Sequence, residues 1–294
     1  MSRLKKALEA GKFPMVAELK PPKGISLEGM FSPVGLLKER VTAFSVPDNE
    51  HARMALSSLA ACRLLKEADV EPLLHLTCRD RNRLALESDL LGAAALGINN
   101  VLAVSGDYVT LGDHPQAKPV YDADSVQLLQ IAQGLMAGHD SAGLPLNGNP
   151  DFFLGAVVIP EADPWAPQLI KFEKKVAAGA QFFITPAVFD LEKFRAFRQS
   201  LPQHPIKILA SLKILGQEEL AQAREGTWRK VYSLPPEILQ ELTATEANNL
   251  LLKGAEIAGR LLKQLKEENL ADGVYLKTQG RADLFTLVLE AAGL

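Results

Sequence analysis

Short apolar runs recur along the chain and are typical of strands buried in a parallel sheet. The predicted strands occupy residues 13–19, 41–46, 73–77, 100–104, 153–159, 181–185, 206–212 and 273–277. Stretches with helical periodicity separate them, and several follow an Asp, Ser or Thr suited to a helix N-cap. The predicted helices include residues 51–68, 80–96, 124–138, 166–179, 191–200, 246–270 and 281–292.

This regular alternation of strands and helices predicts an α/β fold, a (β/α)8 TIM barrel. A doubly wound open sheet is the alternative, but no G-x-G-x-x-G joins the first strand to a helix, as a dinucleotide site of that fold requires. Repeats, linkers and low-complexity tracts are absent from the sequence, so we interpret residues 1–294 as one domain. Residues 213–245 are expected to form an elaborated connection with a helix at 216–225.

Composition narrows the class of protein. Of the 294 residues, 47% are apolar, which supports a sizeable core. With 32 Lys and Arg against 35 Asp and Glu, the net charge of −3 provides no overall basic field for nucleic acid or an anionic membrane. Two cysteines, Cys62 and Cys78, are too few for a disulfide framework. Because the sequence has neither a signal-peptide core nor a membrane-spanning apolar stretch, we expect a soluble cytoplasmic protein.

Polar side chains stand where the predicted strands end. Glu18 closes the first apolar run just before Pro21 and Pro22, which forbid its continuation. In a barrel these ends meet at one mouth, where active sites collect. Several acids facing one mouth raise each other's pKa, which suits a general acid. The other polar residues at strand ends are Ser45, Asp48, His75, Thr77, Ser105, Asp107, Glu161, Asp163, Thr185, Lys277, Thr278 and Gln279.

Each candidate also has a purely structural explanation. Glu18 could pair with a lysine, and Asp107, after Gly106, could close a tight turn. His75 lies within an apolar run and suits a core histidine. The histidines lack the spacing of a zinc site, so no metal is expected. The sequence also lacks the G-x-S-x-G motif of a serine nucleophile.

An ordered set of motifs resembles the methylenetetrahydrofolate reductase family over nearly the whole chain. The motifs are ELKPPKG, HLTCRDR, LAVSGD, YDADSVQLL, IPEADP, KFEKKVAAGAQFFIT and FDLEKFRAF. The resemblance implies an FAD-bearing barrel that passes a hydride from reduced flavin to 5,10-methylenetetrahydrofolate and yields 5-methyltetrahydrofolate.

The resemblance also assigns roles to residues of this chain. Glu18 matches the general acid that protonates the folate as its imidazolidine ring opens, and Asp107 matches an aspartate beside flavin and pterin. Both, together with Thr185, are the implied substrate-binding residues. The implied cofactor-binding residues are Ser45, His75, Ser105, Gly106, Ile159, Asp163 and Lys175.

The chain departs from the family pattern at several of these positions. Ser105 stands where relatives often carry arginine, and Pro186 stands in place of a glutamine that binds folate. Ile159 and Asp163 replace a tyrosine and a histidine. The electron source is therefore left open between NAD(P)H and a reduced protein partner, and a homo-oligomer or a complex subunit is expected. Two alternatives also stay open: a pterin-dependent methyltransferase without flavin, and a non-catalytic subunit that binds a partner.

Overall fold

The strands form one closed parallel barrel. The computed structural model describes residues 1–202, 204–224, 233–278 and 281–294. Each strand pairs with the next, and the last pairs with the first, in the order β1-β2-β3-β4-β5-β6-β7-β8. This closure confirms the predicted (β/α)8 barrel and rules out the open sheet. The strands are Met15–Glu18 (β1), Ala43–Val46 (β2), Pro72–Thr77 (β3), Asn100–Val104 (β4), Phe153–Val157 (β5), Phe182–Ala187 (β6), Lys207–Lys213 (β7) and Gly273–Lys277 (β8).

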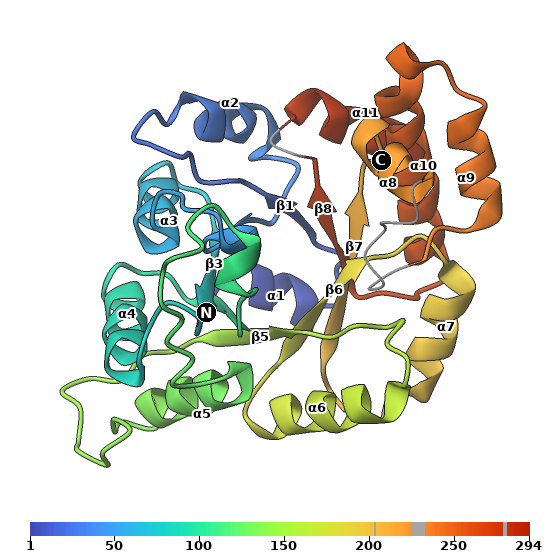
Figure 1. Cartoon of the computed structure of the whole chain (residues 1–294). Helices are drawn as coiled ribbons and strands as arrows, with labels where there is room; N and C mark the ends of the chain where they lie inside the picture. The colour runs from blue at the N-terminus through green and yellow to red at the C-terminus, as the bar shows by residue number, and fades with distance from the viewer. Residues whose placement is uncertain (203, 225–232, 279–280) are drawn as a thin grey trace.

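Helices surround the strands on the outside of the barrel (Figure 1). Large apolar side chains fill the layer between strands and helices. In the described part of the chain no helix is long and apolar enough to cross a bilayer. The helices are Arg3–Glu9 (α1), Glu28–Leu37 (α2), Ser58–Glu67 (α3), Arg83–Ala95 (α4), Ser125–Met136 (α5), Trp165–Ala177 (α6), Leu191–Ser200 (α7), Gln217–Arg224 (α8), Pro236–Thr243 (α9), Leu250–Glu267 (α10) and Ala282–Ala292 (α11), with short 3₁₀ turns at Glu50–Ala52 (η1), Val109–Leu111 (η2) and Ala247–Asn249 (η3).

Three of these helices were not predicted: α1, α2 and α9, the last of which lies in the stretch expected only to form an elaborated connection. Helix α2 contains Pro33 and two glycines, which disguise its helical period. Helix α1 is short, and its apolar residues Leu4 and Leu8 are fully buried against the inner face of the barrel. It therefore plugs the end of the barrel at which the strands begin. The predicted helix at 216–225 is confirmed as α8 up to Arg224, whereas 225 and the strand-end candidate Gln279 lie outside the described residues.

Side chains along each strand point alternately inward and outward, and this period places the candidate site. Val16 belongs to the inner layer and Ala17 to the outer one, so Glu18 points inward. The same alternation directs His75 inward, two positions beyond the inner-layer residue Leu73, and Tyr275 itself belongs to the inner layer. Inward positions are therefore apolar near α1 and become polar toward the opposite mouth.

Candidate functional site

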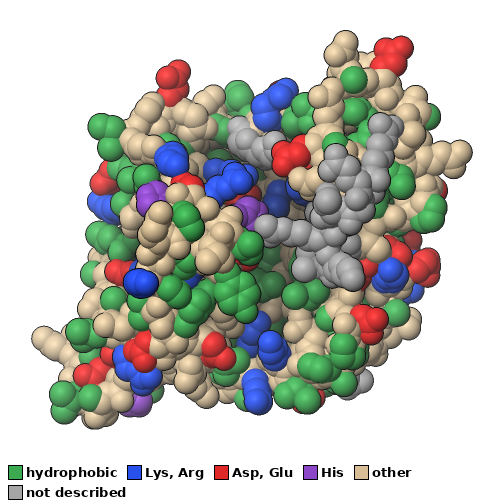
Figure 2. All heavy atoms as spheres, in the orientation of Figure 1, with side chains coloured by type: hydrophobic (Ala, Val, Ile, Leu, Met, Phe, Trp, Pro, Cys, Tyr) green, Lys and Arg blue, Asp and Glu red, His purple; other side chains and the backbone are tan. Residues whose placement is uncertain are grey.

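A cavity of about 520 Å³ opens at the mouth where the strands end. Figure 2 shows this face hollowed at its centre, with basic side chains on the walls. Leu102, Val157 and Ile184 provide apolar wall, and the volume falls within the roughly 300–1,000 Å³ of small-molecule sites. The predicted site residues that line the cavity are His75, Ser105, Gly106, Asp107, Ile159, Lys175 and Thr185.

Glu18 lies beneath this cavity in a buried charge cluster. Its side chain is 3% exposed, and its Oε2 accepts a hydrogen bond of 2.7 Å from the Tyr275 hydroxyl. The Lys277 Nζ lies 2.9 Å from the same oxygen and 2.9 Å from Oε1 of Glu50. Register brings these strands together, because β1 pairs with both β2 and β8. One ammonium group thus bridges two carboxylates, and it separates Glu18 from the open cavity.

Contacts among these buried groups determine the charge states of Lys277, Glu50 and Tyr275. Burial opposes the charge of Lys277, but Glu18 and Glu50 outweigh it and raise the pKa of Lys277 above its ordinary value. Burial likewise opposes the Glu50 carboxylate, yet Lys277 lowers the pKa of Glu50 to about 2. The pKa of Tyr275 is raised by burial and by the neighbouring Glu18. Lys277 is therefore a cation, Glu50 an anion and Tyr275 a neutral hydrogen-bond donor at neutral pH.

His75 and Ser45 form the neighbouring polar pair. The Ser45 hydroxyl lies 2.7 Å from Nε2 of His75, and Ser45 is completely buried. Burial, together with the Lys277 charge, lowers the pKa of His75 to about 3. The imidazole is therefore neutral at physiological pH and offers one donor and one acceptor.

This neutral histidine makes stability depend on pH. The pKa of His75 is about 3 in the folded chain and about 6.5 in the unfolded chain, so the unfolded chain binds more protons between these values and stability falls as pH falls below 6.5. From pH 7 to 5 the native chain should lose up to about 2 kcal/mol more free energy of unfolding than His75→Gln. Urea denaturation of both chains at each pH measures the difference. Equal pH dependence would contradict a neutral His75.

Asp107 stands at the rim of the cavity, after β4. Its side chain is 44% exposed, and Oδ2 lies 3.2 Å from Nδ1 of His51. The preceding Gly106 has φ +96°, and a Cβ there would approach the Thr77 hydroxyl to 2.3 Å, so only glycine fits this turn. The Tyr121 hydroxyl donates to the Asp107 carbonyl at 3.0 Å and holds the turn.

Of the remaining predicted cofactor-binding residues, Lys175 and Ser105 line the cavity and Asp163 does not. Lys175 reaches from α6 to the cavity, where its Nζ donates to the Val157 carbonyl at 2.7 Å, and burial lowers its pKa to about 8. The Ser105 hydroxyl accepts a hydrogen bond from the Ser125 N–H at the start of α5. Asp163 is exposed and does not line the cavity, so its contact with a cofactor stays a prediction.

Sequence reasoning missed Tyr275 and Glu50, and it identified Lys277 only as a polar residue at a strand end without a role. Tyr275 and Lys277 occupy alternate positions on β8, and period-two spacing alone would have directed both inward. Glu50 lies in the turn η1, and nothing in the local sequence marks it as the partner of a lysine more than two hundred residues away. Among the described residues no group of three or more His, Cys, Asp or Glu could hold a metal ion.

Comparison with known proteins places the chain in a family. The sequence profile described as "Methylenetetrahydrofolate reductase" matches residues 3–293. The chain belongs to the methylenetetrahydrofolate reductase family. This confirms the resemblance inferred from the ordered motifs.

Relatives within the methylenetetrahydrofolate reductase family are distant. The 5,10-methylenetetrahydrofolate reductase of Salmonella typhimurium is 26% identical over 225 residues, which cover 74% of this chain and 69% of that protein. Methylenetetrahydrofolate reductase 2 of Schizosaccharomyces pombe is 24% identical over 93% of this chain and 44% of its own length. A probable methylenetetrahydrofolate reductase (NADPH) of Caenorhabditis elegans is 23% identical, over 82% of this chain and 35% of its length. The chain thus spans less than half of these two eukaryotic relatives.

Solved structures share the barrel. An uncharacterized protein from Clostridium thermocellum, described as binding two copies of 5-methyl-5,6,7,8-tetrahydrofolic acid, superposes with a TM-score of 0.60 at 15% identity and covers 99% of this chain and 98% of its own. A 2,3-dimethylmalate lyase superposes with a TM-score of 0.54 at 10% identity, over 100% of this chain and 83% of its own. Both likenesses concern the fold alone.

Proposed function

We propose that the chain reduces 5,10-methylenetetrahydrofolate to 5-methyltetrahydrofolate, with FAD as the bound source of hydride. The observation that carries this proposal is the buried Glu18 at the end of β1, held by Tyr275 and Lys277 at the base of the cavity. Family membership supports it, since the sequence resemblance to that family matches Glu18 to its general acid.

The cavity suits a flavin. Leu102, Val157 and Ile184 form apolar wall for a flat ring system, and the neutral His75, whose Nε2 pairs with the Ser45 hydroxyl, adds its other ring nitrogen at the edge. Lys175 uses one N–H on the Val157 carbonyl and keeps two donors for a phosphate-bearing chain. Reduced FAD bound there would supply the hydride that the substrate carbon receives.

Glu18 supplies the proton in this scheme. The bond from the methylene carbon to N10 breaks, N10 keeps the electron pair and takes the proton of Glu18, and the carbon stays on N5 as an iminium that accepts hydride. Lys277 controls this acid, since its ammonium lies equally close to Glu18 and Glu50. Movement of the ammonium toward Glu50 would open a path from Glu18 to the ligand.

Asp107 assists at the rim. Its carboxylate, 44% exposed and facing the same cavity, would favour the iminium cation and accept hydrogen bonds from the pterin ring. Thr185 lines the cavity from β6, where its hydroxyl donates to the Pro186 carbonyl. At the position where relatives carry glutamine, the folate would contact Pro186 and the backbone beside it.

The expected electron source is a reduced protein partner in place of NADH or NADPH. Ser105 and Pro186 replace the arginine and glutamine of relatives, and both line the cavity face where a nicotinamide would have to bind. We expect the isolated chain to oxidise NADH or NADPH weakly or not at all, and a reduced protein partner to serve instead. Anaerobic stopped-flow mixing of the flavin-loaded chain with NADH measures this. Bleaching of the flavin at roughly 1–1,000 per second would contradict it.

Turnover with a reduced dye tests the function itself. The purified chain, loaded with FAD and supplied with reduced viologen, should convert 5,10-methylenetetrahydrofolate to 5-methyltetrahydrofolate. A chain that purifies without flavin and takes none up would favour the methyltransferase alternative. Tightly held flavin without turnover from any donor would favour the non-catalytic subunit.

A further inference from the structure

A buried arginine beside the barrel cavity has no role in the mechanism proposed above. Arg79 follows β3 and lines the cavity, yet its side chain is only 3% exposed. Its guanidinium donates two hydrogen bonds to the carboxylate of the neighbouring Asp80, from Nε at 2.8 Å and from Nη2 at 2.7 Å. This two-bond pairing balances the charge of Arg79 locally and fixes the plane of its guanidinium.

The same guanidinium holds the loops on both sides of it. Nη2 also donates to the Asn49 carbonyl at 3.2 Å, in the loop after β2, and Nη1 donates to the Asp107 carbonyl at 3.4 Å, in the loop after β4. The backbone carbonyl of Arg79 accepts a further bond of 2.8 Å from the Val120 N–H. Because β2, β3 and β4 are neighbours in the barrel, one side chain from the middle loop joins the loops of the two adjacent strands.

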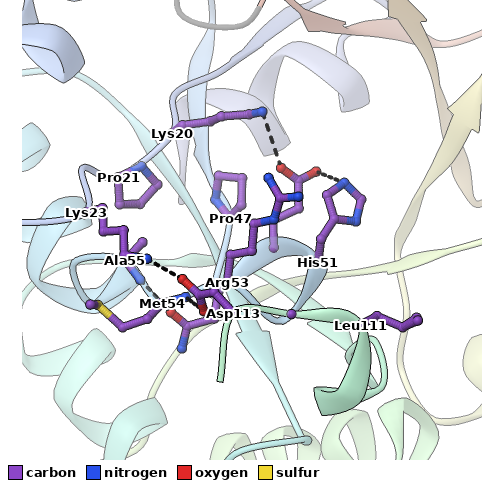
Figure 3. A pocket seen from close by; sticks show the side chains of 13 residues that line it. Lys20, Pro21, Lys23, Pro47, His51, Arg53, Met54, Ala55, Leu111 and Asp113 are labelled. Carbon is purple, nitrogen blue, oxygen red and sulfur yellow. Dashed lines mark hydrogen bonds and ion pairs between the residues drawn. The ribbon is translucent and has the colours of Figure 1, made fainter. Parts of the chain in front are cut away.

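The loop after β2 has a backbone conformation that needs such support. Asn49, His51 and Ala52 have φ of 47°, 56° and 57°, in the left-handed region that non-glycine residues seldom adopt. This loop separates the barrel cavity from a second hollow of about 530 Å³, and Figure 3 shows the His51 ring on the wall of that hollow. Rare backbone conformations persist only where the surroundings hold them, and the bond from Arg79 to the Asn49 carbonyl is one such contact.

The loops after β2 and β4 meet at the surface through His51 and Asp107. Nδ1 of His51 lies 3.2 Å from Oδ2 of Asp107, and both side chains are about half exposed. Arg79 lies deeper and bonds to the backbone on each side of this contact, at Asn49 and at Asp107. The turn before Asp107 packs directly on it, since a Cβ at Gly106 would lie 2.7 Å from the Arg79 Cβ. The place of the Asp107 carboxylate therefore depends on Arg79.

We propose that Arg79 is a positioning residue that holds the Asp107 carboxylate in place at the barrel cavity. The inference rests on the proposed function, in which Asp107 favours the iminium cation. A carboxylate that stabilises a developing cation must stay at a set distance from it, and a displacement of about 1 Å can cost on the order of a hundredfold in rate. Arg79 acts on the reaction through the backbone of Asn49 and Asp107 and does not touch the reacting atoms.

A double-variant comparison of single-turnover rates tests the inference. Arg79→Lys keeps a cation beside Asp80 but cannot hold both loops at once. When the photoreduced, flavin-loaded full chain is mixed with saturating 5,10-methylenetetrahydrofolate, this variant should reoxidise roughly ten- to a hundredfold more slowly than the native chain. Asp107→Ala removes the carboxylate that is positioned. In that background Arg79→Lys should slow the rate by less than about twofold more, because nothing is left to position.

Two further variants control the comparison. Arg83→Lys changes another arginine after β3, which pairs with Asp122 and does not line the cavity, and it should reoxidise at close to the native rate. Asp80→Asn leaves Arg79 in place and weakens its pairing at a partly exposed position. It should slow reoxidation in the same direction as Arg79→Lys, and it too should have little effect once Asp107 is alanine.

Amide hydrogen exchange tests the contact between the loops without any turnover. The Ala52 and Ala55 N–H groups donate to the carbonyl and side chain of Asn49. In Arg79→Lys both amides should exchange faster than in the native chain, whereas the amides of α4 should exchange at native rates. Native exchange rates at Ala52 and Ala55 in this variant would overturn the inference, because Arg79 would then not hold the loop.

The rates separate this inference from the proposed function. Losses that multiply in the double variant would show that Arg79 does not act through Asp107, which would overturn the inference and leave the reductase proposal standing. A native chain whose flavin stays reduced in the presence of the folate would overturn both.

Discussion

Replacing Glu18 with glutamine should leave reduction of the flavin intact and slow its reoxidation by 5,10-methylenetetrahydrofolate by roughly two to four orders of magnitude. Glutamine keeps the shape of the side chain and can still accept from Tyr275, but it has no proton to transfer to N10. Stopped-flow absorbance of the photoreduced protein measures the rate directly.

A second acid at a strand end provides the control for this substitution. Glu161 follows β5, does not line the cavity, and accepts a hydrogen bond of 2.9 Å from the Ser233 N–H. Glu161→Gln should reoxidise at close to the native rate. Native-like reoxidation in Glu18→Gln would show that Glu18 is a structural partner of Lys277 and that the proton comes from elsewhere.

Replacing Lys277 with methionine should lower the free energy of unfolding by about 2–4 kcal/mol. The substitution keeps a long apolar stem but leaves Glu18, 3% exposed, without its cation and takes the nearer cation from Glu50. Removing one member of a buried ion pair is costly because the partner charge stays desolvated, and the partial exposure of Lys277 moderates the loss. Urea denaturation at neutral pH measures the change.

The double variant Glu18→Gln/Lys277→Met separates pairing from packing. Because Glu18→Gln removes the charge that Lys277→Met strands, the combined loss should be smaller than the sum of the single losses by about 1–3 kcal/mol. Additive losses would mean that Glu18 and Lys277 do not interact in solution, and the control of the acid by Lys277 would then have no basis.

The barrel could be predicted because the local sequence of each strand carries a recognisable pattern. Buried parallel strands consist of short apolar runs, and β4 agrees with its predicted residues 100–104 at both ends. Helix α2 was not predicted because Pro33 and its glycines have low helix propensity. Packing against the strands and α11 stabilises the helix despite that propensity. Helix α1 was not predicted because it is stabilised by burial inside the end of the closed barrel, which the sequence of the helix alone does not reveal.

The candidate site was predictable where it depends on strand ends and not where it depends on pairing across strands. Glu18, His75 and Asp107 follow directly from the rule that strand ends converge at one mouth. The bridge from Lys277 to Glu18 and Glu50 joins β8, β1 and η1, and only barrel closure brings these segments together. Neither the spacing nor the composition of the chain carries that information.

A single-turnover experiment tests the central claim most directly. The flavin-loaded chain is photoreduced without oxygen and then mixed with 5,10-methylenetetrahydrofolate, while the absorption band of oxidised flavin is followed. The account predicts that the band returns and that one equivalent of 5-methyltetrahydrofolate forms for each flavin reoxidised. A flavin that stays reduced, with the folate recovered unchanged, would contradict it.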